Sequence, residues 1–246
     1  MWPYPVIIAH RGGGNLAPEN TLAGIRCGLE HGFHAVEFDV MLASDAVPIL
    51  MHDPQLGRTV SGQGNVFDHS AAQLAAMDAG IWFDARFKGE PVPNLRQVLE
   101  FCIAHRIWMN IEIKPAVGFE VQTGQVTAQV VRELFTPAVS APTPLFSSFS
   151  FAALLAAKEV APEIPRGFLM DVIGADWQQQ LQQLDAVSLH TNYRHLTAAQ
   201  TQAVKQAGYG LMCYTVNNPV RAREILDWGV DAFCTDRIDL IGADFH

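Results

Sequence analysis

The sequence lacks a surplus of positive charge, which excludes the most general way of binding nucleic acid or an anionic membrane. Lysine and arginine number 16 against 25 aspartate and glutamate residues, so the formal net charge is −9. Proteins that hold a polyanion through its phosphates need a basic face. A phosphate ligand of this chain must therefore be held by a few placed cations. We expect no nucleic-acid partner and no membrane insertion.

Cysteine is also scarce, and no two cysteines are close in the sequence. The four residues are Cys27, Cys102, Cys213 and Cys234. No CxxC pair occurs, and the spacing matches no zinc motif. Their apolar surroundings predict reduced side chains in the core.

Long hydrophobic runs are missing as well. No apolar run approaches the ~18 residues of a membrane span. Residues 1–5 lack the basic region and the apolar stretch of a signal peptide. Cytoplasmic residence is therefore the default expectation. With 246 residues, of which 49% are hydrophobic and 17% charged, the composition is that of a soluble globular protein.

What the sequence does contain is a regular alternation of short apolar strands and helical patterns. Strands are predicted over residues 5–10, 34–40, 47–51, 107–113, 144–147, 165–170, 186–190, 210–216 and 231–235. Helices are predicted over residues 21–31, 95–105, 121–135, 150–160, 176–184, 197–207 and 219–228, the first of them capped by Asn20 or Thr21. Such an alternation implies a parallel sheet with both faces covered.

About eight such units in about 250 residues predict an α/β fold, a (β/α)8 TIM barrel formed by a single domain over residues 1–246. The ninth strand candidate, 47–51, is expected to pair as a hairpin with strand two through a turn at 44–46. The irregular interval at about 53–94 is too long for a simple loop, although it contains a helical turn series at 70–77. We interpret it as a small inserted subdomain over the carboxyl-terminal mouth of the barrel. Its Trp82 and Phe83 either form an apolar wall for an alcohol group or pack the insertion onto the barrel.

Carboxylates follow two of the predicted strands. Glu37 and Asp39 are two residues apart, so on a strand they face the same side and can share one hard cation. Glu112, near the end of another strand, can supply a third oxygen ligand. Mg²⁺ and Ca²⁺ both take carboxylate oxygens, so the sequence leaves the choice open. The alternative is that Glu37 and Asp39 form ordinary surface ion pairs.

Two histidines and two cations complete the candidate site. His10 and His52 each follow an apolar strand, and histidine accepts and donates protons near neutral pH. Arg11 and Lys114 are the placed cations that can hold a phosphate, although Lys114 can also form a simple salt bridge with Glu112. Together these groups indicate metal-assisted chemistry on a phosphate ester.

Several further residues have two interpretations. Glu19 either supports the site or caps a helix, and Asn217 either contacts substrate, supports the site or forms a turn. Asp236 is interpreted as structural, and His190 is left open. The glycines at 12–14 allow close approach of the backbone.

The chain resembles the glycerophosphodiester phosphodiesterase family, and is most similar to its bacterial cytosolic branch. The resemblance runs nearly end to end, and the matching fragments are His10-Arg11-Gly12, Pro18-Glu19-Asn20-Thr21, Glu37-Phe38-Asp39, His52-Asp53 with Leu56 and Arg58-Thr59, Ile111-Glu112-Ile113-Lys114, Tyr214-Thr215-Val216-Asn217 and Gly229-Val230-Asp231. Tyr214 stands where the family has an aromatic residue, often tryptophan, and Ala46 stands where a turn glycine is common.

The resemblance implies a (β/α)8 barrel with an insertion after strand two. It implies one divalent metal held by the carboxylates of Glu37, Asp39 and Glu112. It also implies acid–base catalysis by His10 and His52, and a phosphate held by Arg11 and Lys114. The implied substrates are glycerophosphodiesters such as glycerophosphocholine or glycerophosphoethanolamine, and the products are sn-glycerol 3-phosphate and an alcohol.

Three alternatives remain. A non-catalytic barrel that binds phosphate esters needs no histidine pair. A sphingomyelinase D-like phosphodiesterase has a similar pair, but the chain is less similar to that branch. An aldolase with a Schiff-base lysine would have to use Lys114, whose neighbour Glu112 favours the charged form. The alcohol preference, the roles of the two histidines, a cyclic intermediate against direct attack by water, and the oligomeric state stay open.

Overall fold

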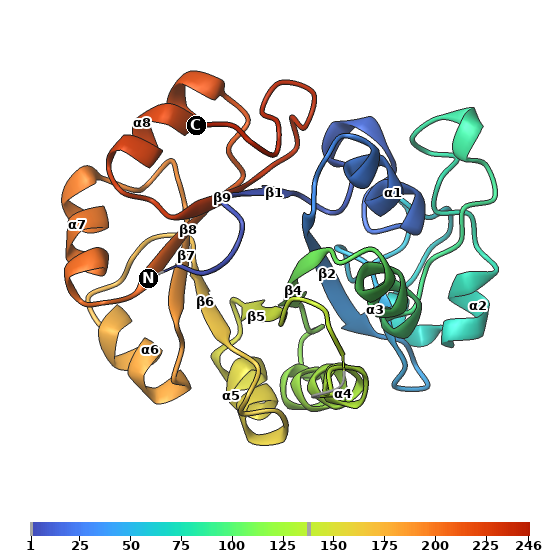
Figure 1. Cartoon of the computed structure of the whole chain (residues 1–246). Helices are drawn as coiled ribbons and strands as arrows, with labels where there is room; N and C mark the ends of the chain where they lie inside the picture. Colours follow the sequence, from blue (N-terminus) through green and yellow to red (C-terminus); the bar gives the residue numbers. More distant parts are fainter. Residues whose placement is uncertain (1, 137–138) are drawn as a thin grey trace.

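The apolar strands of the sequence form the wall of a closed barrel (Figure 1). The structure is a computed structural model that describes residues 2–136 and 139–246. Within these residues eight parallel strands close the barrel, namely β1 Ile7–Ala9, β2 Ala35–Leu42, β4 Trp108–Ile113, β5 Leu145–Ser148, β6 Arg166–Met170, β7 Ser188–Asn192, β8 Gly210–Tyr214 and β9 Ala232–Thr235. Pairing of β1 with both β9 and β2 closes the ring. The predicted TIM barrel is confirmed.

Helices between the strands cover the outside of the barrel (Figure 1). They are α1 Leu22–Glu30, α3 Leu95–Ala104, α4 Glu120–Leu134, α5 Phe151–Val160, α6 Trp177–Leu184, α7 Ala198–Gln206 and α8 Pro219–Asp227. Local sequence explains their starts. Thr21 rather than Asn20 caps α1, since its hydroxyl accepts from the Gly24 N–H over 2.9 Å. Asn94 and Gln97 form a capping box at α3.

The ninth strand is the predicted hairpin. Strand β3 (Pro48–Leu50) pairs antiparallel with the end of β2. Ala46 lies at the turn with φ 58°, a left-handed conformation in which glycine is more common.

Between β3 and α3 the chain forms a largely irregular segment beside the barrel. It contains α2 (Ala71–Ala75) and two 3-10 turns, Val66–Asp68 and Ala85–Phe87, while a third 3-10 turn, Gly14–Leu16, follows β1. A small apolar cluster that includes Met51, Val66, Leu74 and Val92 packs beneath it and is separate from the main core. The extent of the insertion and the single-domain interpretation stay predictions.

The two ends of the barrel interior differ in chemistry. At the amino-terminal end, Trp2, Tyr4 and Trp108 pack together, and the Tyr4 and Trp108 rings stack with centroids 4.9 Å apart. Higher in the barrel, His190 is fully buried and its Nε2 contacts the Ser188 hydroxyl over 2.9 Å. Gly167 makes room for this ring, because a Cβ there would lie 2.3 Å from the histidine Nε2. The carboxyl-terminal end holds the charged residues.

Candidate active site

Three carboxylates converge inside the carboxyl-terminal end of the barrel. Glu37 and Asp39 lie on one face of β2, and Glu112 lies beside Asp39 in the register of β2 and β4. One oxygen from each lies within 4.8 Å of the others. Among the described residues, this is the only group of acidic, histidine or cysteine side chains close enough to share a metal ion.

Burial and neighbouring charges drive the pKa values of the three carboxyl groups apart. Burial and the charge of Asp39 raise the pKa of Glu37 to about 7 and that of Glu112 to about 8. Burial acts in the same direction on Asp39, but the charges of Lys114 and Arg11 outweigh it and lower the pKa of Asp39. Because a divalent cation relieves such repulsion, the arrangement suits a metal.

An unsatisfied atom gives independent support to this interpretation. In the part of the chain that the structure describes, the buried Glu37 Oε1 has no hydrogen-bond partner. Buried polar atoms without a partner are rare, and each calls for a ligand, a water or an ion. The carboxylate set therefore fits a hard divalent cation.

His10 follows β1 and is oriented by a carboxylate from the end of β9. Its Nδ1 lies 2.6 Å from Asp236 Oδ1. Burial disfavours the ionised form of Asp236, but the bond to His10 outweighs it and lowers the pKa, so the carboxylate accepts and Nδ1 donates. Asn217, after β8, donates in turn to Asp236 Oδ2 over 2.8 Å. The His10 Nε2 then lies 3.7 Å from Glu37 Oε2.

The pKa of His10 is the balance of opposing effects. Burial lowers it, and so does the charge of Arg11, while the hydrogen bond to Asp236 and the charges of Glu37 and Asp236 raise it by more. The pKa of His10 is therefore raised above its ordinary value.

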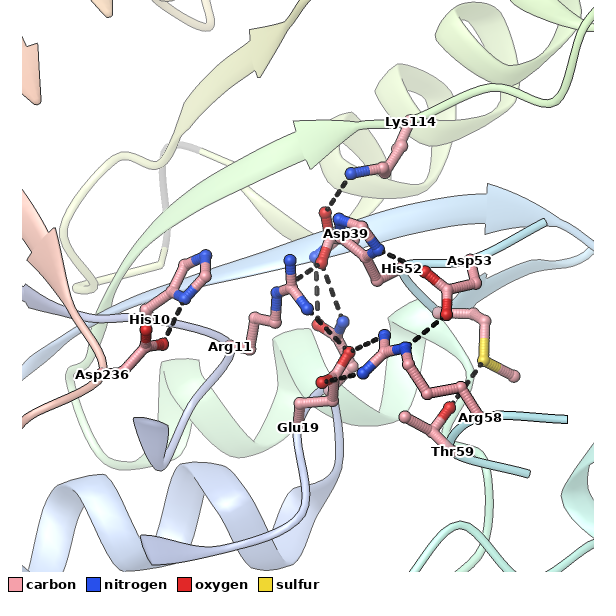
Figure 2. A network of polar contacts seen from close by, with 12 residues as sticks. His10, Arg11, Glu19, Asp39, His52, Asp53, Arg58, Thr59, Lys114 and Asp236 are labelled. Atoms are coloured by element: carbon pink, nitrogen blue, oxygen red, sulfur yellow. Dashed lines mark hydrogen bonds and ion pairs between the residues drawn. The ribbon is translucent and has the colours of Figure 1, made fainter. Parts of the chain in front are cut away.

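His52 lies across the site and belongs to a second network. Its Nδ1 lies 2.6 Å from Asp53 Oδ1, and the other oxygen of Asp53 accepts from Arg58 (Figure 2). Arg58 donates from both terminal nitrogens to Glu19, each over 2.7 Å, and Glu19 also accepts from Arg11 over 2.8 Å. Burial is the main cause that lowers the pKa of His52. The network ties the loop after β1 to the segment after β3.

Arg11 and Lys114 place two positive charges over the carboxylates. The Arg11 backbone N–H donates to Glu37 Oε2 over 3.1 Å, and its side-chain Nε lies 3.4 Å from Asp39 Oδ2. The Lys114 Nζ lies 3.3 Å from Asp39 Oδ1 and 3.6 Å from Glu112 Oε1. Burial lowers the pKa of Lys114, but these two carboxylates raise it by more, so the amine stays charged. The salt bridge with Glu112, which the sequence left as an alternative, is present and is shared with Asp39.

The two histidines, the three carboxylates and the two cations line one cavity of about 250 Å³, called here the central cavity. Its remaining wall is mostly apolar and includes Phe149, Leu169, Met212, Tyr214 and Cys234. The ring of Tyr214 packs edge-on against Phe149, with centroids 5.7 Å apart. The geometry thus joins a charged half to an apolar half in one site.

The structure also places the residues for which the sequence left two interpretations. Glu19 does not cap α1; it lies between two arginines. Asn217 supports the site through Asp236 rather than forming a simple turn. Trp82 and Phe83 line a second cavity beside the central one. His190 lies inside the barrel, where burial lowers its pKa to about 3 and keeps it neutral.

One sequence interpretation needs correction. Asp236 was expected to be structural, but its carboxylate contacts His10 directly. The glycines at 12–14 do permit a close approach of the backbone, as predicted. A Cβ on Gly14 would lie 2.2 Å from the Asp236 carbonyl oxygen, and one on Gly12 would lie 2.8 Å from the Ile25 backbone nitrogen of α1.

Sequence reasoning also missed residues that hold the site together. Asn20 has φ 56°, and its amide donates to Asp39 Oδ2 over 2.8 Å while its oxygen accepts from the Asp39 N–H. Asn110 lines the central cavity and lies on β4 two residues before Glu112, so the two side chains share a face. Asp53 and Arg58 stood in the matching fragments, but no role was assigned to them. Period-2 spacing on β4 could have found Asn110.

Comparison with known proteins assigns the chain to a family. Residues 10–240 match the sequence model of the Glycerophosphoryl diester phosphodiesterase family. The chain belongs to this family. It is 30% identical to a glycerophosphodiester phosphodiesterase of Caldanaerobacter subterraneus, covering 94% of this chain and 93% of that protein. It is accordingly an enzyme of the glycerophosphodiester phosphodiesterase class, as the resemblance implies.

Solved structures agree with this assignment. A phosphodiesterase of Oleispira antarctica, solved in complex with the product sn-glycerol-3-phosphate, is 36% identical with a TM-score of 0.89 and covers 94% of this chain and 93% of that one. A glycerophosphodiester phosphodiesterase of Agrobacterium tumefaciens is 28% identical with a TM-score of 0.76, covering 96% and 98%. In the described part of the chain, no helix combines the length and apolarity needed to cross a membrane.

Proposed function

We propose that the chain hydrolyses glycerophosphodiesters, such as glycerophosphocholine and glycerophosphoethanolamine, to sn-glycerol 3-phosphate and an alcohol. The observation that carries the proposal is the convergence of two histidines, two cations and three carboxylates on one cavity. The product found in the Oleispira antarctica phosphodiesterase supports the choice of substrate. The partner is thus a small molecule, and cytoplasmic residence stays a prediction.

Glu37, Asp39 and Glu112 are the proposed ligands of one divalent cation, Mg²⁺ or Ca²⁺. Their oxygens are close enough, and the unpartnered Glu37 Oε1 leaves a lone pair for it. When bound, such a cation neutralises phosphate charge and lowers the pKa of an attacking oxygen. Asn20 keeps Asp39 in place by two hydrogen bonds.

Arg11 and Lys114 are proposed to hold the phosphate. Both are charged and partly accessible, with side chains 19% and 27% exposed. The guanidinium is fixed between Glu19 and Asp39, so its orientation costs little entropy when substrate binds. The two cations therefore hold the phosphate over the carboxylates.

His10 and His52 are proposed to move the protons. A bond forms between phosphorus and the attacking oxygen, while the bond between phosphorus and the alcohol oxygen breaks. One histidine takes the proton of the attacking hydroxyl, and the other gives a proton to the leaving alcohol. The attacking group is either water, which gives sn-glycerol 3-phosphate directly, or the 2-hydroxyl of the substrate. In the second case a cyclic phosphate forms first, and water then attacks its phosphorus and breaks the bond to the 2-oxygen to give sn-glycerol 3-phosphate. Asp236 and Asp53 position the two rings, each through Nδ1.

The test is the release of glycerol 3-phosphate from glycerophosphocholine by the purified chain. EDTA should abolish release, and Mg²⁺ or Ca²⁺ should restore it. The matched control is the His10→Ala, His52→Ala double variant, which should stay inactive with either cation. Folded wild-type protein that releases no glycerol 3-phosphate with either cation would support the binding-protein alternative instead.

A further inference from the structure

A second cavity lies next to the central one and is called here the side cavity. It has a volume of about 340 Å³. Its walls come from the loop after β1, from the end of β9 and from the segment after β3, through Asn15, Glu19, Asp236, Trp82 and Phe83. His10 and Arg11 line both cavities. A phosphate held at Arg11 would lie between the two cavities, so each is accessible to one of its substituents.

The two substituents of the phosphate are assigned by the side of Arg11 on which each cavity lies. Figure 2 shows His10 and Asp236 on one side of Arg11, with Asp39, His52 and Lys114 on the other. The central cavity carries the carboxylates proposed to hold the metal, and it suits the glycerol 3-phosphate half. The alcohol half then lies in the side cavity.

The outer wall of the side cavity is aromatic. The rings of Trp82 and Phe83 meet edge to face with centroids 5.6 Å apart. The Trp82 indole N–H is already used, since it donates to the Ala79 carbonyl over 2.8 Å. The residue is 39% exposed and lines the side cavity, so it offers an aromatic surface rather than a hydrogen-bond donor.

The carboxylates of the side cavity are negative but already hydrogen-bonded. Asp236 accepts from His10 and Asn217, one on each oxygen. Glu19 accepts from Arg11 and Arg58 on its two oxygens. A polyol would compete with these partners for hydrogen bonds. A quaternary ammonium group has no N–H to place, and aromatic faces attract it without a hydrogen bond. The charges of Glu19 and Asp236 are already offset by Arg11, Arg58 and His10, so the attraction rests on the aromatic wall.

We propose that the side cavity receives the leaving alcohol and favours an alcohol with a quaternary ammonium group over a neutral polyol. This inference rests on the proposed function and concerns its selectivity. Trp82 and Phe83 are the residues that determine the preference. None of the hydrogen bonds described above joins either residue to a proposed metal ligand or to a carboxylate that orients a histidine.

The test is the ratio of kcat/KM for glycerophosphocholine to kcat/KM for glycerophosphoglycerol. Trp82→Leu should lower this ratio roughly 3- to 30-fold, the range of a cation–π contact, and Phe83→Leu should lower it less. Trp82→Phe keeps an aromatic ring and should retain most of the ratio. The matched control is Phe67→Leu, an aromatic of the same segment that packs on Phe119 with centroids 5.3 Å apart.

Inhibition by sn-glycerol 3-phosphate provides a second readout. Its inhibition constant should be unchanged in Trp82→Leu, because the product is placed in the central cavity. Hydrolysis with an unchanged substrate ratio in Trp82→Leu and Phe83→Leu would overturn this inference alone, and so would an equal loss of product affinity. A wild-type chain that hydrolyses neither diester would overturn the proposed function first, and this inference with it.

Discussion

The two ends of β4 show how one strand serves two purposes. Trp108, at the amino-terminal end, stacks on Tyr4, and its indole N–H donates to the Thr143 carbonyl over 3.0 Å. Two and four residues later, Asn110 and Glu112 face the central cavity. Asn110 Oδ1 has no partner among the described residues, and burial and neighbouring charge raise the pKa of Glu112. One end is satisfied internally, whereas the other needs a ligand.

The difference teaches where stability and function are separated in this fold. Burying a satisfied aromatic group stabilises the folded state, while an unsatisfied polar atom or a repelling carboxylate destabilises it. The carboxyl-terminal end can hold its charges because apolar packing elsewhere in the barrel offsets their cost. Substitutions at the two ends should therefore affect different measurements.

The largest expected effect is on turnover at the charged end. His10→Ala and His52→Ala should each lower kcat by roughly 10²–10⁴-fold, because each removes a proposed proton-transfer group. Circular dichroism should show an unchanged fold. The matched control is His34→Ala, an exposed histidine outside the site. Near wild-type turnover in either variant would remove that histidine from the mechanism.

At the aromatic end the expected loss is in stability. Trp108→Ala should lower the free energy of unfolding by about 3–5 kcal/mol, since a buried ring in contact with Tyr4 is removed. Denaturant unfolding measures this change. The kcat of the remaining folded protein should stay near that of wild type. A kcat loss comparable to that of the histidine variants would show that the two ends are not separate.

A smaller effect on turnover is expected at Asp236, which is hydrogen-bonded to His10. Asp236→Asn should lower kcat by roughly 10- to 100-fold with KM little changed, because the ring loses the carboxylate that fixes its orientation and tautomer. The pH profile of kcat should also shift, since Asp236 raises the pKa of His10. A change in stability alone, with an unaltered pH profile, would mean that Asp236 is only structural.

The smallest expected effect is on the pH dependence of stability, and it comes from His190 inside the barrel. The pKa of His190 is lowered from 6.5 to about 3 by burial, so the unfolded chain takes up the proton first as pH falls. Stability should therefore decrease between about pH 6.5 and 3, by about 2 kcal/mol at pH 5. Urea unfolding of wild type and His190→Gln at pH 7.5 and 5 checks this. The same pH dependence in both proteins would contradict the assignment.

The sequence could predict the parts of the site that depend on strand periodicity. Glu37 and Asp39 share a face because they are two residues apart, and the βα alternation predicted the barrel that brings Glu112 beside them. The strand and helix positions agree with the structure to within a few residues.

Contacts made through loops were beyond such reasoning. Asp236 reaches His10 because the loop after β1 packs on the end of β9, with Gly14 against the Asp236 backbone. Arg58 reaches Glu19 from an irregular segment 39 positions away in the sequence. Neither contact follows from a repeat or a local signal. They are set by tertiary packing, which explains why Asp236 was misinterpreted.

The central claim is that the three carboxylates form a divalent-metal site, and metal titration tests it most directly. The melting temperatures of EDTA-treated wild type and Glu112→Gln would be followed while Mg²⁺ or Ca²⁺ is added. Binding to the folded state should raise the wild-type melting temperature with metal concentration. Glu112→Gln should respond much less. Equal shifts in both proteins, or none in the wild type with either cation, would contradict the account.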